Sequence, residues 1–256
     1  MCTQSVPAFY QGSTLEVINF VTEPGRWVLR PICEEFARYL PATISTKPDT
    51  QAKVNVFVNY ALYQSINTKT VGFFTHREKD SNSFDQIAQE CDWCVAMCNR
   101  TAGYLPKKKT SIIQVWPNSK YIKDKIVFGV VGRQYSSGRK RFWMAEPLKE
   151  IEGIEVRFTN GEIPEEKMTD FYREIDYLLV LSNNEGGPVP VVEALGMGVP
   201  VIAPNVGFCW SFPVLRYETQ KDLISVIKRL RIPKDGWQQS ALQLETICRN
   251  LLTEAF

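Results

Sequence analysis

Residues 182–204 read SNNEGGPVPVVEALGMGVPVIAP, and this stretch decides the fold of the chain. It follows residues 177–181 (YLLVL), a short apolar run typical of a strand covered on both faces of a parallel sheet. Residues 190–197 then predict a helix with Pro190 in its first turn, where a missing N–H costs nothing. Glycines end the helix, and residues 199–203 (VPVIA) predict the next buried strand.

Two carboxylates flank the glycine turn that opens this helix. Glu185 is expected just beyond the end of the strand, and Glu193 about one turn into the helix. The unpaired N–H groups at a helix start, together with the helix dipole, attract phosphate. A carboxylate that accepts hydrogen bonds from vicinal hydroxyls grips a ribose or a hexose. The pattern therefore predicts a site for a nucleotide-sugar.

The same segment resembles the signature of the retaining glycosyltransferases of family 4 and their GT-B relatives. In that signature two glutamates separated by seven residues precede a GVPVIA strand. The resemblance implies that Glu185 contacts the hydroxyls of the donor sugar and that Glu193 holds the ribose. It implies donor contacts for the turn as well, at Gly186, Gly187 and Val189. Pro188 departs from the pattern, because many members carry a second glycine there and use its N–H.

The competing interpretation of this segment is an ordinary strand, turn and helix with two glutamates facing solvent. The spacing of the two glutamates alone does not separate the two interpretations. The glycine turn and the VPVIA strand, both in register with the glutamates, favour the glycosyltransferase signature.

A basic motif stands upstream. Residues 126–131 (IVFGVV) predict another buried strand, and residues 132–142 (GRQYSSGRKRF) follow it. Arg133 and Lys140 flank a Ser-Ser-Gly turn, and two cations at one strand end can neutralise a diphosphate leaving group. The resemblance extends to both cations, with Arg139 as a neighbouring candidate. It further implies that Ile163, in the loop after the strand at 154–160, lies near the nucleotide base. The alternative for residues 132–142 is a basic loop in water.

The order of elements from residue 125 onward is strand and helix in alternation, which predicts a doubly wound parallel sheet. Ligands bind such sheets at the carboxyl ends of the strands. The first half repeats the alternation less cleanly, with strands expected in five places and helices in two. The expected strands are residues 15–21, 54–58, 70–75, 93–98 and 112–115, and the expected helices are 27–40 and 84–90.

These elements predict an α/β protein of two Rossmann-like domains, which the resemblance identifies as a GT-B fold with the domains facing a central cleft. Residues 1–118 are expected to form an acceptor-side domain and residues 119–235 the nucleotide-sugar-binding domain. Residues 236–256 are expected to form a helix that crosses back to the first domain. The first domain is shorter than is common among GT-B proteins, so we expect a trimmed version.

The resemblance also implies roles for two residues in the first half of the chain. His76, the only histidine, follows the strand expected at 70–75, where family 4 enzymes place a histidine close to the reacting sugar. A lone histidine is more often a surface or core residue than a catalyst, and its position favours the catalytic role here. Gly25, in the first strand-to-helix turn, corresponds to a loop near the phosphates and the acceptor.

The cysteines and the charge balance narrow the class of protein. Cys91, Cys94 and Cys98 have a spacing that superficially indicates metal, but we expect reduced core thiols and no metal site. An odd count of 7 cysteines, no secretory leader and no apolar run of membrane length predict a cytoplasmic protein without a membrane span. A net charge of +2 does not indicate a nucleic-acid partner, although residues 107–109 form a basic run.

The expected activity is transfer of a hexose from a nucleoside diphosphate sugar to an acceptor hydroxyl with retention, without metal or other cofactor. The acceptor stays open among a saccharide, a small molecule, a protein and modified DNA. Three alternatives remain open: the same chemistry on a modified nucleic-acid base as in phage DNA glucosylation, a nucleotide-sugar epimerase, and a non-catalytic sugar-nucleotide binding module.

Overall fold

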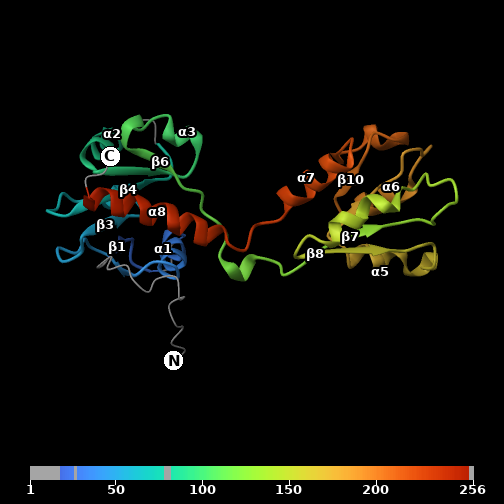
Figure 1. Ribbon diagram of the computed structural model, residues 1–256, viewed down its shortest axis with the longest axis horizontal. Coiled ribbons are helices and arrows are strands. Elements are labelled where there is room, and N and C mark those ends of the chain that lie inside the picture. Colours follow the sequence, from blue (N-terminus) through green and yellow to red (C-terminus); the bar gives the residue numbers. More distant parts are fainter. Residues whose placement is uncertain (1–17, 26–27, 78–81, 254–256) are drawn as a thin grey trace, which may run out of the picture. The chain divides into compact units, whose positions relative to one another are not determined.

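The computed structural model describes residues 18–25, 28–77 and 82–253 (Figure 1). The chain forms two compact units. Unit 1 comprises the residues up to Ile122 together with those from Pro233 onward, and unit 2 comprises Lys123–Ile232. The boundaries expected from the sequence are residues 118 and 235. The expected residues 15–17, 27 and 254–256 lie outside the described part of the chain.

Unit 1 contains a six-stranded parallel sheet in the order β2-β1-β3-β4-β5-β6. Its strands are β1 (Ile18–Val21), β2 (Ala42–Ser45), β3 (Val54–Phe57), β4 (Lys69–Phe74), β5 (Trp93–Ala96) and β6 (Thr110–Ile112). Its helices are α1 (Leu29–Ala37), α2 (Asn82–Glu90), α3 (Asn99–Ala102) and α8 (Gly236–Thr253). The sequence pattern does not predict β2, and β6 begins two residues before the strand expected at 112–115.

The last helix completes the core of unit 1. Figure 1 shows α8 lying along the sheet of unit 1, although its sequence follows unit 2. Trp237 packs edge-on against Phe36 of α1 at 5.2 Å between ring centroids, and Leu244 and Cys248 are fully buried in the same cluster. The other face of the sheet carries a second cluster, in which Tyr60 stacks on Phe74 and Phe84 packs edge-on against both rings.

Unit 2 contains a five-stranded parallel sheet in the order β11-β10-β9-β7-β8. Its strands are β7 (Ile126–Val130), β8 (Ile154–Phe158), β9 (Tyr177–Leu179), β10 (Val201–Ala203) and β11 (Leu215–Arg216). Its helices are α4 (Glu146–Lys149), α5 (Met168–Arg173), α6 (Val189–Gly196) and α7 (Gln220–Leu230). The sequence pattern predicts neither the short strand β11 nor the helix α7.

The run at residues 177–181 has the double burial that its apolar sequence predicts. Leu178 and Val180 face the cluster that includes α5 and α6, whereas Leu179 and Leu181 face the cluster that includes α4 and α7. A strand buried on both faces requires helices on both sides of the sheet. The two doubly wound parallel-sheet domains that the sequence predicts are therefore confirmed.

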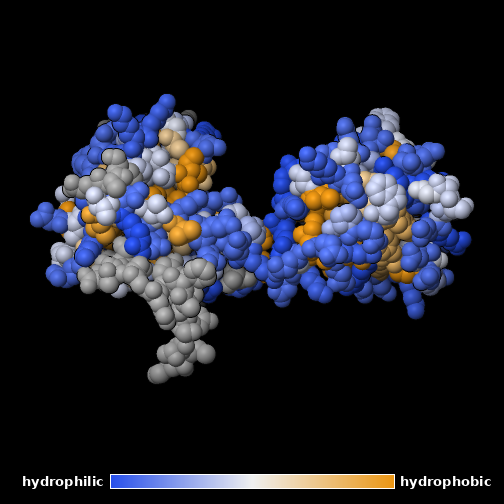
Figure 2. All heavy atoms as spheres, viewed as in Figure 1, coloured by the Kyte–Doolittle hydropathy of each residue, from blue (hydrophilic) through white to orange (hydrophobic). Residues whose placement is uncertain are grey.

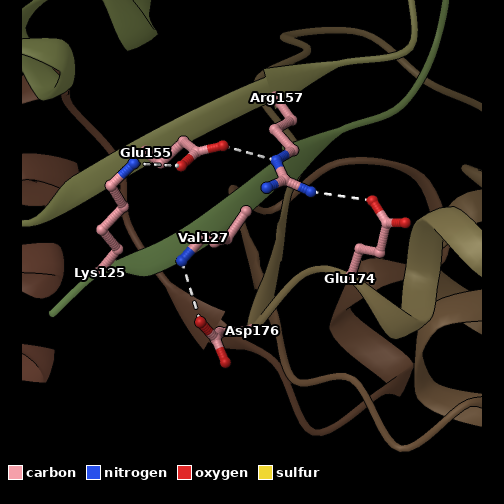
Figure 3. Close-up of polar contacts among 6 residues, drawn as sticks. All are labelled: Lys125, Val127, Glu155, Arg157, Glu174 and Asp176. Atoms are coloured by element: carbon pink, nitrogen blue, oxygen red, sulfur yellow. Dashed lines mark hydrogen bonds and ion pairs between the residues drawn. The ribbon is translucent and has the colours of Figure 1, made fainter. Parts of the chain in front are cut away.

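A network of charged side chains lies along the edge strand β8 (Figure 3). Arg157 donates to Glu155 at 2.7 Å and to Glu174 at 2.9 Å, and Lys125 donates to Glu155 at 3.2 Å. Lys125 precedes β7, so this network begins at the end of the strand opposite to the basic loop. Its exposed charges provide control positions for the experiments below.

Figure 2 shows mostly hydrophilic residues on the visible surface of each unit. Several large apolar side chains are exposed in unit 2, among them Trp210 and Trp143. Within the described residues, no helix combines the length and the apolar character that a membrane crossing requires.

Candidate active site

The candidate site lies at the carboxyl edge of the unit 2 sheet. The strand order reverses between β7 and β9, because the chain runs from β7 outward to β8 and then returns to the other side of β7. In doubly wound sheets ligands bind at such a switch point, beyond the carboxyl ends of the two strands. The basic loop follows β7 and the acidic glycine turn follows β9, so both sequence motifs meet at the switch point.

Lys140 and Glu185 form an ion pair across the switch point. The Lys140 Nζ lies 2.6 Å from Glu185 Oε1, and the two side chains are only 16% and 11% exposed. Gly132 makes room for the lysine, because a Cβ at this position would lie 3.3 Å from Lys140 Cε and Nζ. The structure thus joins one residue of the basic loop to one residue of the glycine turn.

The surroundings of Glu185 favour its charged form. Burial alone would raise the pKa of Glu185, but the Lys140 ammonium, the Ser182 hydroxyl and the Arg139 guanidinium outweigh it and lower the pKa. A carboxylate held ionised by a nearby cation is an acceptor for hydroxyl groups rather than a proton donor. Glu185 is therefore suited to accept hydrogen bonds from hydroxyl groups.

The basic loop is anchored to the end of β9 by Arg141, which the sequence marks only as part of a charge run. Arg141 donates from Nε to the Leu181 carbonyl at 2.7 Å and from NH2 to the Ser182 carbonyl at 3.1 Å. The Asn183 N–H donates to the Arg139 carbonyl at 3.0 Å. Arg139 itself lies over the ring of Tyr135, 4.4 Å from its centroid. These bonds hold Lys140 next to Glu185.

Arg133 lies on the β8 side of the end of β7, whereas Lys140 lies on the β9 side. A Cβ on Gly161 would meet the Arg133 side chain at 2.3 Å, so the guanidinium arm crosses the turn that follows β8. That turn has positive φ at Asn160 (51°) and Gly161 (75°). The structure therefore places Lys140 toward β9 and the exposed Arg133 toward β8, on either side of the end of β7.

The loop after β8 also carries Ile163. The side chain of Ile163 is half-buried and packs on the cluster that includes α5 and α6. The loop is closed by the Glu162 N–H, which donates to the Thr159 carbonyl at 2.9 Å, while the Thr159 hydroxyl accepts from the Gly132 N–H at 3.0 Å. The loops after β7 and β8 are therefore connected directly, which brings Ile163 to the same edge as Arg133.

The glycine turn packs against the segment that follows β10. A Cβ on Gly187 would lie 2.4 Å from a ring carbon of Phe208, whereas a Cβ on Gly186 would meet nothing within 4 Å. Gly207 has a φ of 51°, and a Cβ there would lie 2.6 Å from the Gly186 carbonyl oxygen. Within the glycine pair, only Gly187 is required by its neighbours in the folded unit. The turn then leads into α6, whose first residue is Val189 and whose N-cap is Pro188.

Glu193 is exposed on α6 and accepts a hydrogen bond from the hydroxyl of Tyr172, at 2.6 Å from Oε2. Tyr172 lies on α5 and is 2% exposed. Its burial, and then the Glu193 carboxylate, raise the pKa of the phenol, so Tyr172 stays protonated and donates. Sequence reasoning missed Tyr172, since nothing in the segment around it marks a partner of α6.

In unit 1, His76 is exposed and follows β4, with its Nδ1 2.8 Å from the Thr75 hydroxyl. Gly25 follows β1 with a φ of 89°, and a Cβ there would meet nothing within 4 Å among the residues that the structure describes. The strand order of unit 1 reverses between β1 and β3. There Asn59 donates to Glu23 at 2.7 Å, a polar pair that the sequence does not single out.

The expectation that the clustered cysteines are all core thiols is wrong for one of them. Cys91 and Cys94 are buried, but β5 ends at Ala96 and Cys98 is exposed at the start of α3. The strand itself ends two residues before Cys98, whose Sγ lies 3.4 Å from the Thr101 hydroxyl oxygen. Among the described residues, no group of three or more His, Cys, Asp and Glu side chains is arranged to hold a metal ion.

The basic run at residues 107–109 is only partly free to meet a polyanion. Lys109 Nζ donates to the backbone carbonyls of Gln89, at 2.7 Å, and Cys91, at 2.5 Å, at the end of α2. A lysine at the last carbonyls of a helix satisfies acceptors that lack helical partners. Lys107 and Lys108 are exposed.

Comparison with known proteins places the site in a family. A family model described as glycosyl transferases group 1 matches residues 81–211, just over half of the chain. The matched stretch contains the basic loop, Glu185 and Glu193, whereas Gly25 and His76 precede it.

A D-inositol 3-phosphate glycosyltransferase of Thermobifida fusca (strain YX) is 29% identical over 87 residues. The aligned part covers 34% of this chain and only 20% of that relative. Among solved structures, a sucrose-phosphate synthase from Thermosynechococcus elongatus is 16% identical, with 79% of this chain and 74% of that chain covered and a TM-score of 0.36. WaaG, a glycosyltransferase involved in lipopolysaccharide biosynthesis, is 12% identical, with 91% and 94% covered and a TM-score of 0.35. By the match to the family model, this chain belongs to the group 1 family of glycosyl transferases.

Proposed function

We propose that this protein transfers a hexose from a nucleoside diphosphate sugar to an acceptor hydroxyl, with retention at the anomeric carbon. The donor would bind at the carboxyl edge of the unit 2 sheet. The observation that carries the proposal is the ion pair between Lys140 and Glu185, which joins the two motifs at the switch point of the sheet. Family membership supports the reaction class.

The two residues of the ion pair would bind different parts of the donor, Lys140 the diphosphate and Glu185 the sugar. A diphosphate at this edge adds negative charge beside Lys140 and competes with Glu185 for its ammonium. As Lys140 turns to the phosphate oxygens, the Glu185 carboxylate becomes available to the sugar hydroxyls. Arg133 approaches from the β8 side and Lys140 from the β9 side, so a diphosphate above the end of β7 would lie between the two cations. The N–H groups of Gly187 and Val189 at the start of α6 add further donors.

In the proposed reaction, the bond between the anomeric carbon and the phosphate oxygen breaks and a bond to the acceptor oxygen forms on the same face. The acceptor proton passes to the departing phosphate oxygen, so no protein base is required. Arg133 and Lys140 stabilise the charge that develops on the leaving group. Because these cations and the helix terminus perform that task, we propose that the reaction needs no divalent metal.

The remaining residues have positioning roles in the proposal. Glu193 holds the ribose, and Ile163 lies next to the base. His76 holds a sugar hydroxyl near the reacting bond, and the Gly25 turn approaches the phosphates or the acceptor. The acceptor hydroxyl belongs to a saccharide, a small molecule, a protein or modified DNA.

The test begins with a panel of UDP-, GDP- and ADP-sugars, each examined for thermal stabilisation of the protein and for release of nucleoside diphosphate with and without EDTA. We expect one base to stabilise the protein and its sugar to be hydrolysed slowly, with faster release when an acceptor is added. Lys140→Ala should lower turnover about 100-fold, by loss of a charge that acts on the leaving group. Lys125→Ala, which removes an exposed lysine at the other end of β7, is the matched control.

Each competing function has its own signature in the same assay. Conversion of the sugar without an acceptor would indicate an epimerase, and binding without any release of nucleoside diphosphate would indicate a binding module. Turnover that depends on DNA and falls in a Lys107→Ala/Lys108→Ala variant would move the acceptor to a nucleic-acid base. Failure of every nucleotide-sugar to bind would refute the proposal.

A further inference from the structure

Tyr172 connects the core of unit 2 to the carboxylate assigned to the ribose. Its ring is packed among buried residues of α5, β9 and α6, and it lies edge-on to Phe171 with 6.1 Å between ring centroids. Only the hydroxyl reaches outward, where it donates to Glu193 Oε2 at 2.6 Å. A rigid, buried ring thus fixes an exposed carboxylate that otherwise has several free side-chain torsions.

From this geometry we infer that Tyr172 is a positioning residue, which orients Glu193 to accept hydrogen bonds from the vicinal 2′- and 3′-hydroxyls of the donor nucleoside. The inference rests on the proposed function and deepens it. The protein would distinguish ribose from sugars without the vicinal diol. Tyr172 and Glu193 together, rather than Glu193 alone, would be responsible for this selectivity.

The hydrogen-bonding capacity of the pair suits a diol. An ionised carboxylate has about four acceptor positions on its two oxygens, and the Tyr172 hydroxyl occupies one on Oε2. Oε1 and the remaining position on Oε2 can then accept from two adjacent hydroxyls. Because the phenol stays protonated, it donates to Glu193 and leaves the other acceptor positions of the carboxylate to the ribose hydroxyls.

The position of Glu193 on its helix agrees with this role. Glu193 follows Val189 by four residues and Pro190 by three, so its side chain lies on the face of α6 that begins at the proposed diphosphate contacts. Helical side chains point toward the helix N-terminus, which directs Glu193 toward the same end. Ordering a free glutamate on a ligand costs conformational entropy, and a preformed hydrogen bond to Tyr172 reduces that cost.

The pair is also explained by a purely structural role, in which Glu193 merely satisfies a buried phenol. The two roles differ in what Tyr172→Phe does to different nucleotides. We would measure binding of the nucleoside diphosphate that stabilises the wild type best, of its 2′,3′-dideoxy counterpart and of inorganic pyrophosphate, by calorimetry on the full chain. Tyr177→Phe is the matched control, since it removes a phenol from β9 of the same unit, where the ring stacks on Phe128.

We expect Tyr172→Phe to weaken the ribonucleotide roughly 5- to 30-fold, as for loss of one charge-assisted hydrogen bond. Binding of the dideoxynucleotide and of pyrophosphate should stay unchanged, and KM for the sugar nucleotide should rise with little change in kcat. In a Glu193→Ala background the same substitution should have no further effect, because Tyr172 acts through Glu193.

Equal weakening of the ribonucleotide and the dideoxynucleotide would overturn the inference in favour of a structural role. An additional loss in the Glu193→Ala background would overturn it too. If the wild type binds the ribonucleotide more tightly than the dideoxynucleotide but Tyr172→Phe changes neither, this inference fails and the proposed function stands. A wild type that binds none of the nucleoside diphosphates refutes the proposed function, and the inference falls with it.

Discussion

The ion pair between Lys140 and Glu185 should be strongly coupled in the folding of unit 2. We consider Lys140→Met and Glu185→Gln, which remove one charge each; glutamine keeps the length of the side chain, and methionine shortens it by one atom. At 2.6 Å and an effective dielectric constant of 20, the attraction between two unit charges is about 6 kcal/mol. Loss of hydration by two side chains that are 16% and 11% exposed offsets most of this attraction.

Each single substitution leaves one charge without its partner in a largely buried place. We expect each to lower the free energy of unfolding by about 2–4 kcal/mol, slightly less than for a fully buried pair. The double variant should be less destabilised than the sum of the single variants, with a coupling energy of about 1–3 kcal/mol. The assay is urea denaturation, with hydrogen exchange in β7 and β9 to report on unit 2 by itself.

The control cycle uses Lys125→Met and Glu155→Gln, an exposed pair on the same sheet in which the lysine side chain is 67% exposed (Figure 3). Exposed pairs contribute about 0–1 kcal/mol, so this cycle should show little coupling. Additive effects of Lys140→Met and Glu185→Gln, or single effects as small as those of the control cycle, would refute the idea that the switch point depends on this pair.

Three further outcomes follow from the structure. The pKa of Glu185 in the folded protein lies below its ordinary value of 4.5. The stability that its charged form contributes is therefore present above pH 4.5 and is lost as the pH falls through the folded pKa. In urea denaturation between pH 7 and 3, the difference in midpoint between wild type and Lys140→Met should become smaller below pH 4.5. Gly187→Ala should lower the free energy of unfolding by about 1–3 kcal/mol because of Phe208, whereas Gly186→Ala should be neutral or slightly stabilising; equal effects in thermal melts would contradict the packing of this turn. Leu244→Ala should cost about 2–5 kcal/mol and speed hydrogen exchange in unit 1 strands but not in β7 or β9, and uniform acceleration would argue against α8 as part of the unit 1 core.

Much of the fold could be predicted because its signals are local. A strand buried on both faces needs an apolar run, a helix can begin with proline, and glycine can end it, so residues 177–203 predict β9, α6 and β10 within one or two residues. The same logic fails for β2, β11 and Cys98. β2 is a half-exposed edge strand, β11 has two residues, and the apolar pattern at Cys98 continues for two residues beyond the end of β5.

The candidate site was predicted as a set of residue types and not as an arrangement. Spacing and resemblance led to Glu185, Glu193, Arg133 and Lys140, because each lies in the loop or the helix that follows a strand marked by the sequence. Neither spacing nor resemblance shows that Arg133 crosses the turn at Gly161, or that Lys140 turns the other way to Glu185. Such directions depend on loops that meet only when the sheet is assembled.

By itself, the sequence determined the alternation of buried strands and helices, and thereby a protein of two parallel sheets with polar residues at the carboxyl ends of the strands. Only the tertiary structure decided which of those residues meet: Lys140 with Glu185, Tyr172 with Glu193, and α8 with the core of unit 1. The physical reason is that periodicity and turn chemistry act over a few neighbouring residues. The order of strands in a sheet, by contrast, brings distant segments together, and the sequence does not state that order.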